Sequence, residues 1–194
     1  MQIASRYLSL LLVAVVGAAT AAAADSIGYF DAINSDPLPV VGQKYYIRHC
    51  FMYEGGKSET TNYWRGTLVP INSEATLVSI GDKRMVLQLT GGGSVKIENV
   101  EKYSKRSMAT IAHYLLATQP VPIEKFDVAT INAIKSGNLK MGMTKEQVVM
   151  ARGYPPGHKT PSLDDDTWVF WSSRFVMQTI VFTDGVLAKG RGID

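Results

Sequence analysis

The chain has 194 residues, 46% of them hydrophobic, and its 20 basic and 17 acidic residues leave a formal net charge of +3. This length suits one large domain or two small ones. Lysine and arginine are scattered along the chain, without a polybasic cluster. The composition therefore excludes the charge pattern typical of proteins that bind nucleic acid or an anionic membrane surface.

Residues 1–24 have the pattern of a secretion signal. Arg6 supplies a positive charge, residues 8–16 form a short apolar run, and three alanines ending at Ala24 provide a small-residue cleavage site. The run is too short for a comfortable transmembrane helix. We expect cleavage near Ala24 and a periplasmic or outer-membrane-associated protein; an uncleaved N-terminal anchor is the alternative.

Cysteine usage bears on how an exported chain is stabilised and anchored. Cys50 is the only cysteine, so no internal disulfide is expected and the fold must depend on core packing. No cysteine directly follows the predicted signal. We therefore predict no lipid anchor and at most a peripheral association with the outer membrane.

Residues 25–119 are predicted to form a β-rich domain. Short runs of β-forming residues alternate with glycine-rich turns, which favours a small antiparallel barrel or curled sheet, SH3-like in size. An amphipathic helix over residues 107–118, with Ser107 as its N-cap, completes this half. Residues 119–122 contain two prolines and read as a linker. The predicted strands cover residues 45–53, 60–68, 75–80, 84–90 and 94–97.

Residues 123–194 are predicted to form two helices followed by a three-stranded meander. The first helix covers residues 128–135. The second follows a capping box between Thr144 and Gln147 and ends at Gly153, where a positive φ is expected. Aromatic strands at 168–171 and 175–182 and a last short strand at 186–188 follow, with Asp184-Gly185 as the final turn. The fold class predicted for the whole chain is α+β.

Four features of this half occur in a recognisable order: Gly-Met-Thr-x-x-Gln-Val from residue 142, Gly-Tyr-Pro-Pro from 153, the aromatic strand, and Phe-Thr-Asp-Gly-Val from 182. Together they resemble the outer-membrane SmpA/OmlA family, which includes the E subunit of the β-barrel assembly machinery (BamE). The resemblance covers residues 123–190. It implies a BamE-like αα-βββ domain and a scaffold or accessory role in outer-membrane protein assembly or envelope maintenance, with other envelope proteins as partners.

Two other functions remain open at this point. The β-lactamase inhibitory proteins share the αα-βββ arrangement, so a secreted enzyme inhibitor is one alternative. The tyrosines and tryptophans of the first half favour another, a periplasmic module that binds cell-wall glycan or peptide.

The reactive side chains do not form a catalytic or metal-binding pattern. The three histidines, His49, His113 and His158, are not at ligand spacing, and one cysteine cannot complete a structural zinc site. Cys50 lies within an apolar β pattern and is expected to pack as a small hydrophobic residue. Three consecutive aspartates at 164–166 lack the alternation of a calcium loop. We predict no catalytic residue, no cofactor and no metal, and hence a non-enzymatic protein.

An interaction surface is the remaining candidate site. Tyr154, Trp171 and Arg174 lie beside predicted turns, and exposed Trp or Tyr next to Arg is the composition favoured at binding hot spots. Phe175 is instead expected on the buried face of the meander, together with Trp168, Phe170 and Phe182.

Overall fold

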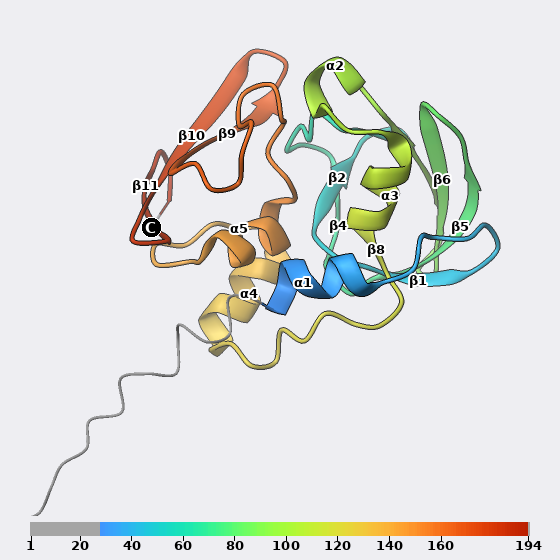
Figure 1. The fold of residues 1–194 in the computed structure, drawn as a ribbon, viewed down its shortest axis with the longest axis horizontal. Coiled ribbons are helices and arrows are strands. Elements are labelled where there is room, and N and C mark those ends of the chain that lie inside the picture. The colour runs from blue at the N-terminus through green and yellow to red at the C-terminus, as the bar shows by residue number, and fades with distance from the viewer. Residues whose placement is uncertain (1–27, 194) are drawn as a thin grey trace, which may run out of the picture.

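The computed structural model describes residues 28–193, so the predicted secretion signal lies outside the described residues. This part of the chain is a mixed α+β protein, in agreement with the predicted class. Figure 1 shows a β-rich half beside a half made of two helices and a meander, with α1 (Gly28–Ser35) lying across both. Within residues 28–193 no helix has the length and apolar character needed to cross a membrane.

The first half is built on an open six-stranded sheet with strand order β3-β7-β6-β5-β1-β8. Its strands are β1 (Lys44–Ile47), β3 (Lys57–Glu59), β5 (Glu74–Ile80), β6 (Arg84–Leu89), β7 (Ser94–Glu98) and β8 (Leu116–Ala117). Since β3 and β8 are the two edges, the sheet is open, and the barrel alternative of the prediction is wrong. The sheet is also not wholly antiparallel, because β3 pairs in parallel with β7.

Two predicted strands of this half are wrong in extent. The run at 45–53 is broken after Ile47, and β2 (Phe51–Tyr53) leaves the large sheet to pair with β4 (Thr67–Val69). The run at 60–68 contributes only its end to β4, because Asn62 and Gly66 adopt φ values of 55° and 96°, which no strand accommodates. The threonines and aromatic residues of the run at 60–68 are typical of a β-strand, which explains the wrong prediction.

Helix α3 (Met108–Leu115) covers one face of the sheet, with Ser107 as its N-cap, as predicted. Its predicted extension to residue 118 is wrong, because Leu116 and Ala117 form β8. The Ser107 side chain accepts a hydrogen bond from the Thr110 amide, which satisfies one of the free N–H groups of the first turn. The short α2 (Glu101–Ser104) precedes it. The buried residues that α3 and the sheet share include Leu77, Met85, Leu87, Val95, Met108, Ala112 and Leu115.

The second half follows the predicted element order: α4 (Val128–Ser136), α5 (Lys145–Arg152), β9 (Thr167–Ser173), β10 (Val176–Thr183) and β11 (Val186–Gly190). The capping box is confirmed. Gln147 N donates to Thr144 Oγ1 at 3.3 Å, and Thr144 N donates to Gln147 Oε1 at 2.9 Å. Gly153 ends α5 with a φ of 72°, also as expected.

The meander buries one face against the helices. Trp168, Phe170, Ile180, Phe182 and Leu187 all belong to this apolar cluster. Phe175 does not, and its predicted burial is wrong: it is 86% exposed, because β9 extends to Ser173 and leaves Phe175 in the turn of the hairpin.

The apolar cluster of the second half extends across the predicted linker. Tyr29, Ile33, Cys50 and Ile71, from the first half of the chain, pack with the helices and meander of the second. The domain boundary at 119–123 stays a prediction, but the hydrophobic core does not divide there.

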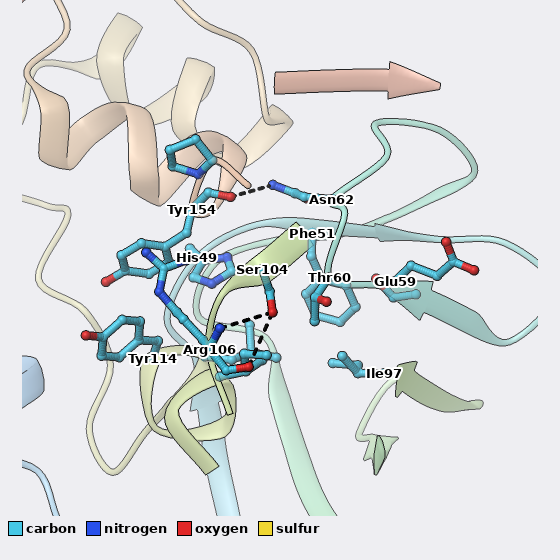
Figure 2. A pocket seen from close by; sticks show the side chains of 14 residues that line it. His49, Phe51, Glu59, Thr60, Asn62, Ile97, Ser104, Arg106, Tyr114 and Tyr154 are labelled. Carbon is cyan, nitrogen blue, oxygen red and sulfur yellow. Dashed lines mark hydrogen bonds between the residues drawn. The ribbon is translucent and has the colours of Figure 1, made fainter. Parts of the chain in front are cut away.

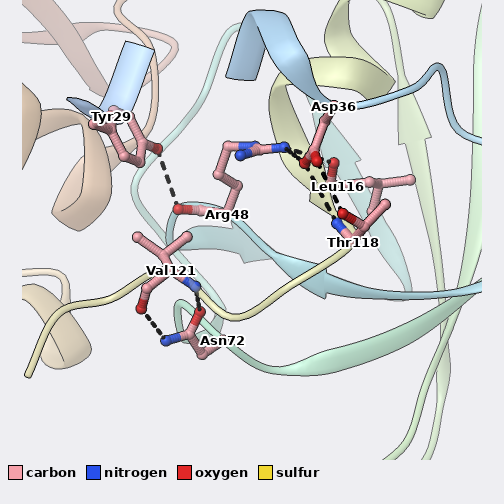
Figure 3. A network of polar contacts seen from close by, with 7 residues as sticks. All are labelled: Tyr29, Asp36, Arg48, Asn72, Leu116, Thr118 and Val121. Carbon is pink, nitrogen blue, oxygen red and sulfur yellow. Dashed lines mark hydrogen bonds and ion pairs between the residues drawn. The ribbon is translucent and has the colours of Figure 1, made fainter. Parts of the chain in front are cut away.

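Helix α1 is held in place by a polar network around a buried arginine, shown in Figure 3. Arg48, only 4% exposed, forms an ion pair with Asp36 and donates to the Leu116 carbonyl. Burial by itself would raise the pKa of Asp36, but hydrogen bonds from Arg48 and Thr118 outweigh it and lower that pKa. Tyr29 closes the network by donating to the Arg48 carbonyl at 3.2 Å.

Candidate functional site

The two halves meet along a seam joined by main-chain hydrogen bonds. Cys50 N donates to Met150 O at 2.9 Å, Trp64 N to Trp171 O at 3.1 Å, and His158 N to Tyr103 O at 3.0 Å. These bonds link α5, β9 and the loop after α5 to the β-rich half. Any site on the seam is therefore held by main-chain bonds from both halves.

A buried arginine reinforces one end of the seam. The Arg152 guanidinium carbon lies 4.1 Å from the centroid of the Trp64 ring, and Nη2 donates to Gln178 Oε1 at 3.2 Å. Burial lowers the pKa of Arg152 to about 10, so it remains a cation at neutral pH. Stacking on the ring compensates in part for lost hydration. Its role is structural.

A cleft opens at the other end of the seam (Figure 2). Its wall is formed by Tyr154, whose ring stacks on Tyr114 with centroids 4.8 Å apart and meets His49 edge-on at 5.6 Å. The Arg106 guanidinium carbon lies 5.1 Å from the Tyr154 centroid and 5.6 Å from that of Tyr114. The cavity measures about 70 Å³. Its apolar lining consists of Phe51, Ile97, Ile111, Leu115 and Pro155.

The histidine and the cysteine at the seam are not suited to nucleophilic catalysis. Burial raises the pKa of the Cys50 thiol to about 11, and Sγ donates to the Ile134 carbonyl at 3.1 Å. Burial also lowers the pKa of His49 to about 4. At neutral pH the pair is thus a thiol and a neutral imidazole, whereas a reactive cysteine requires the thiolate. Cys50 packs as a small hydrophobic residue.

The three residues predicted as an interaction surface do not lie together. Tyr154 belongs to the cleft, where burial raises the pKa of its hydroxyl above the ordinary value. Trp171 lies on β9, half-buried, with its ring 6.2 Å from that of His158. Arg174 is exposed in the β9–β10 turn, its guanidinium 5.6 Å from the Phe175 ring.

Two features are absent from the predicted set. The first is the apolar tip of the β9–β10 hairpin, which we define as Phe175, Val176 and Met177; they are 86%, 53% and 51% exposed. The sequence pattern contained no signal for it, because Phe175 read as the first residue of a strand with a buried aromatic face. The second is Arg106, whose place beside two tyrosines from other elements leaves no local signal in the sequence.

Residues 28–193 contain no group of three or more His, Cys, Asp or Glu side chains that could hold a metal ion. Comparisons with protein-family models, with curated proteins and with solved structures find no match to this chain.

Proposed function

We propose that this chain is an exported, non-enzymatic envelope protein that acts as a scaffold or accessory factor, docking on another envelope protein through the hairpin tip. Residues 123–190 would be a module of the SmpA/OmlA type. The motif order from residue 142 and the signal-like residues 1–24 support this proposal. The observation that carries it is the exposed apolar tip of the β9–β10 hairpin.

The tip is a short stretch of exposed apolar residues. Its three members are consecutive, and Met177 is the cross-strand partner of Trp171, so the two side chains share one face of the sheet. Scattered single hydrophobic residues on a surface are ordinary, whereas a contiguous exposed group marks an interaction site. The opposite face of the meander is already filled by α4 and α5, so the tip has no place in the core.

The tip also has the composition of a binding hot spot. Arg174 lies over the Phe175 ring, and aromatic and arginine side chains dominate the energetics of protein interfaces. Covering Phe175 with a partner surface would remove a large apolar area from water without any conformational change in the hairpin. Docking of a preformed surface is therefore the mechanism we propose.

Site-specific photo-crosslinking in the native envelope tests this proposal. A photo-reactive residue at Phe175 is expected to give a discrete crosslinked species with one envelope protein. Val128 is the matched control, because it is 73% exposed and apolar but lies alone at the start of α4. Equal crosslinking at both positions, or none at Phe175, would refute docking through the tip.

A further inference from the structure

Several polar side chains of the cleft lining have hydrogen-bonding partners within the protein. Thr60 donates to Asn99 Oδ1 at 3.0 Å and accepts from Val100 N, and Ser104 donates to the same Asn99 oxygen at 2.8 Å. Asn62 donates to the carbonyl of Arg152. These three side chains of the lining therefore already have partners within the protein.

The carboxylate of the lining, Glu59, also has a partner within the protein, a lysine. Glu59 Oε1 lies 2.9 Å from Lys57 Nζ, which also contacts Glu98. Arg106 differs from all of these. Among the described residues no carboxylate lies within ion-pair distance of its guanidinium, which lies over the rings of Tyr114 and Tyr154. Arg106 is partly exposed, so its guanidinium N–H groups are accessible to an anion in the cleft.

Another part of the lining is apolar. Phe51, Ile97, Ile111 and Leu115 line the cavity, and Phe51, Ile97 and Leu115 are among the buried residues of the first-half core. A cation beside an apolar cavity matches a ligand with an anionic head and an aliphatic tail. A carboxylate presents two oxygens that fit the planar fork of an arginine, as a phosphate does, and it is the smaller of these two anions.

The size of the cavity limits the tail. At about 70 Å³ it is roughly half of the about 150 Å³ engineered cavity that accommodates benzene. The cavity opens to solvent, so a flexible chain can place its first carbons inside and leave the rest at the mouth, which a rigid ring cannot do. We propose that the cleft between the two halves binds a short aliphatic monocarboxylate, its carboxylate on Arg106 and its tail against Phe51 and Ile111. This site is separate from the hairpin tip, and neither proposal depends on the other.

An NMR titration of the ¹⁵N-labelled protein with hexanoate tests the proposal. We expect chemical-shift changes concentrated at Thr60, Ser104, Ile111 and Tyr154. The Kd should be about 0.1–1 mM, because a ligand with so few atoms contributes little binding free energy. 1-Hexanol has the same tail without the charge and should bind at least about tenfold more weakly, because a hydrogen bond to a charged group is lost.

Three variants distinguish the effect of the Arg106 charge from that of positive charge in general. Arg106→Gln should weaken hexanoate binding at least about tenfold, and Arg106→Lys should restore part of it. Lys102→Gln removes a charge from the neighbouring α2, outside the cleft lining, and should bind as the wild type does. The proposal would be overturned if hexanoate caused no chemical-shift changes or if hexanol bound with equal affinity. It would also be overturned if Arg106→Gln and Lys102→Gln lost equal amounts of hexanoate affinity. The comparison of hexanoate with hexanol uses the unaltered protein, so it stands even if a variant does not fold.

Discussion

Acid should destabilise this protein through His49, a neutral imidazole held at the seam. Burial is the main reason for its low pKa, and the positive charges of Arg48 and Arg106 act in the same direction. The hydrogen bond between Nδ1 and the Cys50 carbonyl, at 3.0 Å, opposes them only in part. Protonation would place a cation next to the rings of the cleft with little access to water.

The sign and size of the effect follow from proton linkage. The pKa of His49 falls from its ordinary 6.5 to about 4 in the folded protein, and one pKa unit corresponds to about 1.4 kcal/mol. Between these two values the unfolded chain binds a proton that the folded chain does not, so stability is lost as the pH falls. The stabilisation is complete above the unfolded pKa. From about pH 7 to about pH 5 the loss amounts to at most about 2 kcal/mol, because over this window the unfolded chain takes up its proton and the folded chain does not.

Urea unfolding of the wild type and of His49→Asn, at several values of pH over this window, measures the effect. Asparagine can keep a hydrogen bond to the Cys50 carbonyl but does not titrate. We expect the free energy of unfolding of the wild type to fall more steeply with acid than that of the variant, with the two slopes converging above the unfolded pKa. Parallel curves throughout the window would refute the assigned protonation state of His49.

Three further predictions concern stability and reactivity. Thr144→Ala removes one side of the capping box and should cost about 1 kcal/mol in the free energy of unfolding; no change in urea midpoint would contradict this. Gly137→Ala places a Cβ 2.3 Å from the Trp64 ring at a φ of +69°, whereas Gly142→Ala, at +84°, meets no atom within 4 Å. Thermal melts should therefore show a larger loss for Gly137→Ala than for Gly142→Ala, and equal losses would exclude the Trp64 contact. Cys50, a buried thiol with its pKa raised to about 11, should resist iodoacetamide in the folded protein at mildly alkaline pH and react once urea unfolds it; mass spectrometry that finds rapid alkylation of the folded protein would show that the seam opens.

Local interactions explain which predictions held. The capping box of Thr144, the positive φ of Gly153 and the Asp184-Gly185 turn depend on atoms a few residues apart, so a short stretch of sequence specifies them. The same holds for the α3 cap at Ser107. The order of helices and meander strands in the second half follows from these signals.

Non-local pairing explains what the sequence left undecided. β3 and β7 lie side by side in parallel although some forty residues separate them in the chain, and no local pattern encodes such a partner. The cleft has the same origin, because His49, Arg106 and Tyr154 come from three distant segments that meet only when the halves pack. Residue type and spacing thus determined the helix caps, the Asp184-Gly185 turn and the order of elements in the second half. Tertiary packing decided which side chains became a cleft, a buried seam or an exposed tip, because burial depends on which distant segments come into contact.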